Sequence, residues 1–253
     1  MWNGDIGFAI YELVLKDYKI RYRNMSLGIF WSLLNPLVMM AVYTFVVTRV
    51  FRQPDPYFPV FVLCGMIPVG FFQYSWLSGT ASLVDNAGLI KKLTLPREIV
   101  PVSSVLSNAM HLVIQLLLIV AIAIAFGKYP NRYWLWLPVI WALFVCFICG
   151  LSLITAPLNV FVRDTRYVVE SINTVIFWLV PVFYSSDLMP EKYRDIYNYN
   201  PVAAITMAMR NIMLDGRAPA MSLLIKLAAV SLGVPLVGYY FFRRVKHRFY
   251  NYL

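Results

Sequence analysis

Four long stretches that contain no Lys, Arg, Asp or Glu limit what this chain can fold into. An apolar helix needs about 20 residues to cross the hydrocarbon core of a bilayer, since each residue adds about 1.5 Å along the axis. The four stretches exceed that length, and two shorter ones follow. In order they are Met25–Thr48, Pro56–Val84, Ile99–Gly127, Tyr133–Val162, Ser171–Ser186 and Leu227–Phe242. We therefore predict an all-α membrane protein with six transmembrane helices.

The composition supports this class of protein. Of the 253 residues, 60% are hydrophobic and 13% are charged, whereas about a quarter are charged in soluble domains. We expect a single domain over 1–253, with a cytoplasmic segment at 1–25, six spans within 28–242 and a basic tail at 243–253. The spans are predicted at about 28–50, 57–78, 101–126, 134–158, 168–186 and 220–242.

The distribution of basic residues predicts that both termini lie in the cytoplasm. Lys and Arg gather at 16–23, 91–97, 163–166 and 243–248, and all four groups become cytoplasmic if the first span starts inside. Basic residues near span ends favour that side of the membrane. The net charge of +10 therefore indicates membrane orientation rather than nucleic-acid binding.

The segment before the first span has the spacing of an amphipathic helix. Phe8, Tyr11, Leu15, Tyr18 and Tyr22 recur at steps of three and four, which places them on one face. We predict an interface helix along the cytoplasmic surface. Its basic residues either anchor it to the membrane or also contact a cytoplasmic partner; they are Lys16, Lys19, Arg21 and Arg23.

Several kinds of site are missing from the sequence. Gly127-Lys128 is followed by Tyr129, so no phosphate-binding loop is formed and any ATP must bind to another polypeptide. Cys146 and Cys149 lie in an apolar run without a nearby His or acidic residue, which favours small buried residues over a metal or redox site. No span carries a charge near its middle, which disfavours ion-coupled transport. We predict no catalytic residue, metal or cofactor in this chain.

Four segments resemble one family of transporters. KDYKIRYRNMSLGIFWSLLNP (16–36) is similar to the start of the first span in ABC-2 family permeases that export lipid-linked polysaccharides, namely O-antigen, group 2 capsule and teichoic acid. LIKKLTLPREIVP (89–101) and NVFVRD (159–164) resemble that family's two cytoplasmic loops. Asn200-Pro201, with the helix expected at Ala203–Leu214, resembles its external gate. The matches follow one another in order and spacing over essentially the whole chain.

The resemblance implies a set of partners and a location. Two copies of the chain would form a channel in the bacterial cytoplasmic membrane, and two copies of a separate ABC ATPase would supply ATP and Mg. O-antigen is the glycan that the overall resemblance favours, which implies a part in lipopolysaccharide biosynthesis. Leu89–Glu98 would be a coupling helix seated on the ATPase, although these loop charges also suit local salt bridges. The implied coupling residues are Leu89, Lys91, Lys92, Pro96, Arg97, Glu98, Arg163 and Asp164.

The resemblance also implies that the first and fifth spans line the channel. Aromatic rings there suit a glycan, because the C–H faces of sugars stack on them. Aromatic residues near span ends are also typical of the membrane interface, and that alternative stays open. The candidates are Trp31, Tyr43, Phe177, Trp178, Phe183 and Tyr184, with Asn200 and Pro201 at the gate.

Two other functions are compatible with such a chain. A membrane-embedded enzyme acting on lipid-linked sugars would need a base or paired carboxylates. The acidic residues of the predicted external loop are interleaved with Lys192, Arg194, Arg210 and Arg217, as on a solvated surface; they are Asp187, Glu191, Asp195 and Asp215. An ABC-2 exporter of drugs or other small molecules is the other alternative.

Overall fold

The computed structural model describes residues 5–22, 30–52, 55–92, 95–184, 200–246 and 248. Within these residues the chain is helical and contains no strand, which confirms the predicted all-α class. The helices are α1 (Ile6–Tyr22), α2 (Phe30–Phe45), α3 (Phe58–Asp85), α4 (Ala87–Lys92), α5 (Ile99–Ala125), α6 (Trp136–Phe161), α7 (Thr165–Leu179), α9 (Pro201–Met213) and α10 (Met221–Val245). A π-helical segment, η1 (Val46–Val50), extends α2, and a 3-10 turn, η2 (Arg132–Leu135), precedes α6.

Five of the predicted spans are long and apolar enough in the structure to cross a membrane. They are Phe30–Val50, Phe58–Asp85, Ile99–Ala125, Arg132–Phe161 and Met221–Val245. The remaining predicted span corresponds to α7, which has 15 residues and covers about 22 Å. The total of six spans and their orientation stay predictions.

Helix α7 ends early because of a proline. Its last residue is Leu179, and Val180 adopts an extended conformation with φ −89° and ψ 135°. Pro181 follows, and a proline disfavours the helical conformation of the residue before it. The chain therefore leaves the helix before the length of a full span is reached.

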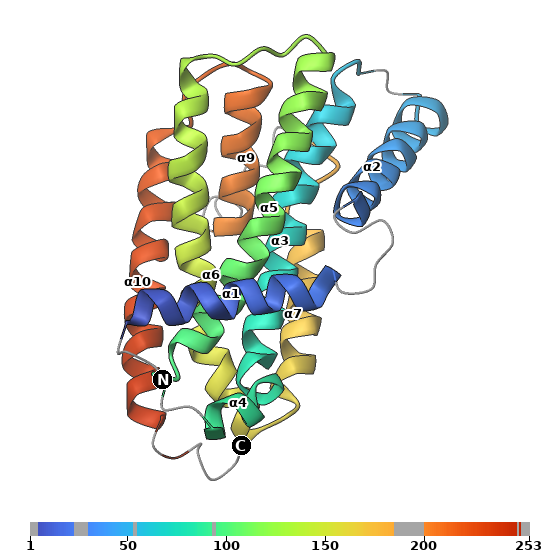
Figure 1. The fold of residues 1–253 in the computed structure, drawn as a ribbon. Coiled ribbons are helices and arrows are strands. Elements are labelled where there is room, and N and C mark those ends of the chain that lie inside the picture. Colours follow the sequence, from blue (N-terminus) through green and yellow to red (C-terminus); the bar gives the residue numbers. More distant parts are fainter. Residues whose placement is uncertain are drawn as a thin grey trace.

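The long helices stand side by side, and α3 packs against α5, α6, α9, α2 and α7 (Figure 1). Helices α6 and α10 approach most closely at two glycines. A Cβ atom at Gly150 would lie 2.5 Å from the nitrogen of Pro235, and one at Gly238 would lie 2.5 Å from the carbonyl oxygen of Gly150. Small residues allow such contact between membrane helices, where apolar side chains gain little from leaving lipid.

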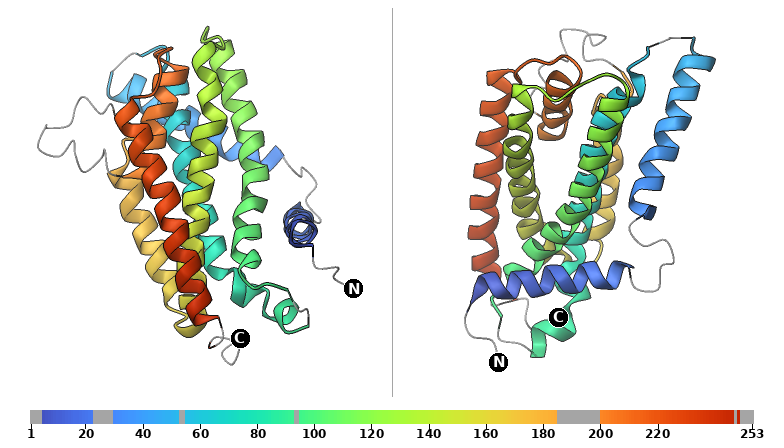
Figure 2. Two further views of the ribbon diagram at one scale, coloured as in Figure 1. Left: turned by 90° about the vertical axis from the view of Figure 1, so that its left-hand side faces the viewer. Right: turned by 45° about the horizontal axis from the view of Figure 1, so that its top comes forward.

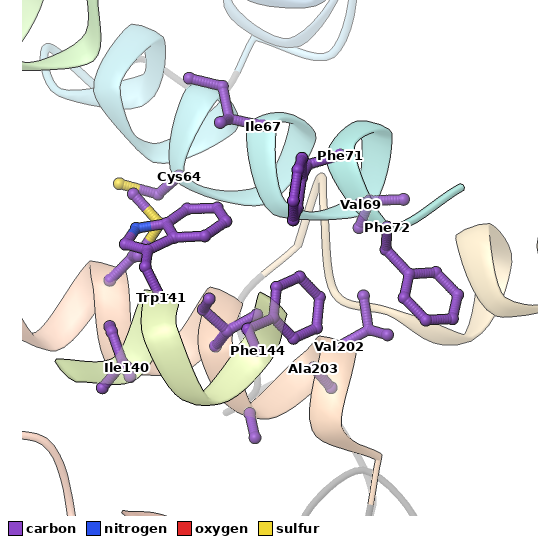
Figure 3. Packing of buried hydrophobic residues seen from close by; sticks show 14 of the residues in the cluster. Cys64, Ile67, Val69, Phe71, Phe72, Ile140, Trp141, Phe144, Val202 and Ala203 are labelled. Atoms are coloured by element: carbon purple, nitrogen blue, oxygen red, sulfur yellow. The ribbon is translucent and has the colours of Figure 1, made fainter. Parts of the chain in front are cut away.

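Two clusters of buried apolar residues hold the bundle together. The larger one joins α3, α5, α6, α9 and α10, and Figure 3 shows Phe71 and Phe72 of α3 packed beside Trp141 and Phe144 of α6. The smaller one lies where α1 and α4 meet the ends of the long helices, and it includes Leu13, Ile90 and Phe242. In two views α1 crosses the bundle instead of running along it (Figures 1 and 2).

Helix α9 was predicted from the sequence, but its burial was not. The side chain of Asn200 accepts a hydrogen bond from the Val202 N–H at 3.0 Å, and Pro201 occupies the first turn. Most of its side chains, from Val202 to Met213, are buried. The helix was expected in a solvated external loop, and that expectation is wrong, because the apolar run that follows Pro201 packs among α3, α6 and α10.

Candidate functional site

Four of the six predicted channel-lining residues form one aromatic cluster. The rings of Tyr43 in α2 and Phe183 are 4.2 Å apart, and those of Phe183 and Phe177 in α7 are 5.8 Å apart. Trp178 meets Phe177 edge-on at 5.6 Å, and 70% of its surface is exposed. The structure therefore brings the first and fifth predicted spans together through these four residues. Their role as a channel lining stays a prediction.

The other two predicted residues lie elsewhere. Trp31 lines a separate pocket between α2 and the helices α3 and α5. Tyr184 is half-buried, and its main-chain oxygen accepts a hydrogen bond from Arg210 at 3.3 Å.

Arg210 is the residue of this region that the sequence analysis placed wrongly. It was counted among the charges of a solvated loop, but only 7% of it is exposed, because α9 inserts it into the bundle. Its Nη2 atom donates to the carbonyl oxygen of Val182 at 2.8 Å and to that of Phe61 at 3.4 Å. The guanidinium carbon lies 3.5 Å from the centre of the Phe61 ring. The sequence did contain one indication of this burial, since Arg210 is the single basic residue in the mainly apolar run 202–213.

The position of Arg210 links three elements. Its hydrogen bonds join α9 to α3 and to the non-helical segment 180–184. That segment carries Phe183, the central ring of the aromatic cluster. Arg210 therefore holds the backbone on both sides of Phe183.

At the opposite end of the bundle, the predicted coupling segment is only partly helical. Helix α4 begins at Ala87 and ends at Lys92, 93–94 lie outside the described residues, and Leu95–Pro96 is not helical. A continuous helix through Glu98 was therefore wrong. Proline lacks the N–H group that a helix interior uses and disfavours helix at the residue before it.

The predicted coupling residues differ in their exposure. Lys91 and Lys92 are exposed, whereas Leu89, Pro96 and Glu98 are partly buried. Arg97 donates to the main-chain oxygen of Lys246 at 2.9 Å, directly after the end of α10. A basic group there satisfies a free carbonyl and favours the negative end of the helix. Arg97 thus binds the loop to α10.

The turn between α6 and α7, predicted to be the second cytoplasmic one, is exposed. Arg163 and Asp164 lie between α6 and α7, and neither side chain makes a hydrogen bond or ion pair within the described part of the chain. The local salt bridges that were the alternative role for these two residues are therefore not observed within the described residues. Their contact with an ATPase stays a prediction.

Helix α1 uses part of its basic face to hold itself in place. Lys16 donates to the side-chain oxygen of Asn86, and Arg21 donates to that of Asn108 at 2.5 Å. Lys19 is exposed, and Arg23 lies outside the described residues. Lys16 and Arg21 therefore hold α1 against the rest of the bundle. Of the three basic residues that the structure describes here, Lys19 is the one that is exposed.

The two predicted faces of α1 are also distributed differently from expectation. Ala9 and Leu13 are buried against the bundle, whereas Phe8 and Tyr11 of the apolar stripe are exposed. Small and medium side chains allow α1 to pack closely on α5. Tyr18 of the stripe also packs inward, since its ring stacks on that of His111 at 5.6 Å.

The chain is similar in sequence to known transport proteins. Residues 9–214 match the ABC-2 type transporter family. The chain is 33% identical over 97% of its length to the O-antigen export system permease protein RfbA of Klebsiella pneumoniae, of which it covers 96%. A protein of the same name from Myxococcus xanthus is 32% identical over 87% of this chain and 86% of its own. The polysialic acid transport protein KpsM of Escherichia coli is 22% identical over 82% of each chain. The protein is a membrane-embedded member of the ABC-2 type transporter family.

Proposed function

We propose that this chain is the permease subunit of an ABC transporter that exports a lipid-linked polysaccharide, of the O-antigen type, across the bacterial cytoplasmic membrane. The observation that carries the proposal is the 33% identity, over nearly the full length of both chains, to an O-antigen export permease. The channel forms from two copies of the chain, and ATP with Mg binds to two copies of a separate ATPase.

The exposed sides of α2 and α7 support a channel shared between two copies. Helix α2 buries only Pro36 fully, and α7 buries only Val169 and Asn173. Both helices contribute to the aromatic cluster. A second copy related by two-fold symmetry would present the same surfaces and complete the lining.

The exposed charges at the α4 end of the bundle support a docking surface for the ATPase. Lys91 and Lys92 are exposed on α4, which lies at the same end of the bundle as the start of α7 (Figures 1 and 2). Arg163 and Asp164 immediately precede α7. Exposed charges on short cytoplasmic elements suit a contact that must form and rearrange during each ATP cycle.

The test is co-expression of the chain with its cognate ABC ATPase in cells that make the glycan but lack their own exporter. We expect surface polysaccharide with the wild-type pair and none with an ATPase variant that cannot hydrolyse ATP. Glycan that is chemically modified but not exported, independently of the ATPase, would instead indicate a membrane enzyme acting on lipid-linked sugars.

A further inference from the structure

A cavity of about 400 Å³ lies between the interface helix and three spans. Its walls are Arg21 at the end of α1, the first turns of α2 and the middle parts of α3 and α5. The volume falls within the range of about 300–1,000 Å³ that is usual for small-molecule sites. We call it the headgroup pocket.

The headgroup pocket gathers polar side chains at membrane depth. Asn35 of α2, Ser75 of α3, and Asn108, His111 and Gln115 of α5 all line it. Polar groups within spans are costly in lipid, and they are retained where they face a ligand or a water-filled cavity. Ser75 is 0% exposed and its hydroxyl has no hydrogen-bond partner among the described residues, so the floor offers a buried polar group to a ligand.

The charge in the headgroup pocket is positive. Its lining, within the described residues, contains Arg21 and no Asp or Glu. Arg21 donates one hydrogen bond to Asn108 and lies 5.3 Å from the centre of the Tyr74 ring. A guanidinium has five N–H donors, so others remain for an anion. Arginine is well suited to phosphate, which accepts two parallel hydrogen bonds from it.

The rim of the headgroup pocket is aromatic and open. Trp31 is 51% exposed and Tyr74 is 66% exposed, whereas Asn108 and His111 are buried at the floor. Aromatic faces at the opening suit the C–H face of a sugar ring, and the amides of Asn35 and Gln115 suit its hydroxyl groups. A ligand anchored at Arg21 would extend past these rings along α2.

We propose that the headgroup pocket binds the junction between phosphate and first sugar of a lipid-linked glycan. The phosphate contacts Arg21, the sugar stacks on Trp31 or Tyr74, and the lipid chain stays in the bilayer beside the exposed side of α2. This inference rests on the proposed function, and it names the part of the substrate that the chain recognises before the polymer moves.

The experiment measures ligand binding to the purified permease–ATPase complex by native mass spectrometry. The main probe is farnesyl diphosphate carrying one N-acetylglucosamine. Farnesyl diphosphate, inorganic pyrophosphate and phosphatidylglycerol are the comparison probes. We expect the glycosylated probe to bind best. The three pocket variants Arg21→Gln, Asn35→Leu and Gln115→Leu should each weaken its binding about tenfold or more.

Matched controls separate the pocket from general effects of mutation. Arg166→Gln replaces an exposed arginine of α7, and Asn211→Leu matches Asn35→Leu. Both controls should keep wild-type affinity to within about twofold. Since Arg21→Gln also removes a contact between α1 and α5, the variants Gln115→Leu and Asn35→Leu decide the outcome if α1 detaches.

Unchanged probe binding in all three pocket variants would overturn the inference, and so would phosphatidylglycerol that competes as well as the glycosylated probe. A failure of the proposed function gives a different result. In that case the wild-type pair exports no glycan in cells, whether or not the pocket binds the probe.

Discussion

The guanidinium group of Arg210 lies among three main-chain oxygens and one aromatic ring, inside a bundle where most neighbours are apolar. Without this group, the carbonyls of Phe61, Val182 and Tyr184 would lose a donor in a region with little water. A side chain of this kind acts as a local replacement for secondary structure, because 180–184 has no helix to satisfy its backbone.

We predict that Arg210→Met lowers the free energy of unfolding by about 3 kcal/mol, because buried carbonyl groups are left unpaired. Thermal unfolding of the purified chain in detergent measures this effect. Arg217→Met is the control, since Arg217 is exposed and its side chain pairs with Asp215 and Asn211, and it should cost about 0.2–1 kcal/mol. Equal stability of the two variants would show that the Arg210 contacts contribute little.

The aromatic cluster gives a second prediction at the residue scale. Changing both Phe177 and Trp178 to alanine should reduce export of long polymer, because sliding sugars lose their stacking surface. The double variant should still insert in the membrane and form dimers. Trp136→Ala, at an exposed position of α6, is the control and should export normally. Surface polysaccharide length on gels is the measurement, and wild-type chain lengths in the double variant would contradict the assignment.

At the scale of elements, the sequence predicted where helices occur better than where they lie. Uncharged runs located α2, α3, α5, α6 and α10, since lipid tolerates few charges in a spanning helix. A short helix was also predicted at Ala203–Leu214, after Asn200-Pro201, and α9 begins two residues earlier, at Pro201. Neither pattern predicts how deeply α9 is buried, because a short apolar helix has the same pattern whether it packs inside a bundle or on its surface.

The close contact between α6 and α10 predicts that a larger residue at Gly150 destabilises the protein. Gly150→Ala should lower the free energy of unfolding by about 1–3 kcal/mol, because the added methyl group meets the backbone of Pro235. Gly233→Ala, also in a helix, has no atom within 4 Å of its new Cβ. It should be neutral or stabilising by up to about 1 kcal/mol. Thermal unfolding compares the two, and similar melting temperatures would exclude close packing at Gly150.

The segment between α3 and α5 carries two exposed lysines, Lys91 and Lys92, and one arginine, Arg97, that binds α10. Replacing Lys91 and Lys92 together with alanine should weaken binding of the ATPase by roughly two- to thirtyfold, measured by co-purification, since each exposed charge pair contributes about 0.2–1 kcal/mol. Thermal stability should not change. Arg97→Ala should lower stability instead, because it loses the contact with Lys246. Unchanged ATPase binding and export in the double variant would make α4 a simple connection.

For the whole molecule, the sequence was sufficient for the class and the family, because both depend on patterns that extend along the entire chain. The candidate site was predicted in part. Tyr43, Phe177 and Phe183 meet as their positions on two spans suggested. Arg210 and the headgroup pocket were missed, because each depends on residues from three or four elements that are far apart in sequence.

The assembly prediction belongs to the whole molecule. In a chain with its cysteines replaced by serine, single cysteines at Val38, Val42 or Phe45 on the exposed side of α2 should give disulfide-linked dimers for at least one position. Leu232 and Leu236 on the exposed side of α10 are the control positions and should remain monomeric. Cross-linking in native membranes, with the ATPase present, is the measurement. Disulfide-linked dimers from the cysteines in α10, but not from those in α2, would place the dimer interface on the exposed side of α10.

The burial of α9 has a consequence for how the protein is made. The carbonyl partners of Arg210, at Phe61, Val182 and Tyr184, all leave the ribosome before Arg210 does. Helix α10 is the last helix to be synthesised that packs against α9. Its residues Leu223, Leu224 and Leu227 belong to the same buried cluster as α9. A nascent chain that has not yet delivered α10 therefore exposes the apolar side of α9. This half of the bundle can therefore close only after α10 has been made, and we expect chains that stop before α10 to be degraded more readily than the full chain.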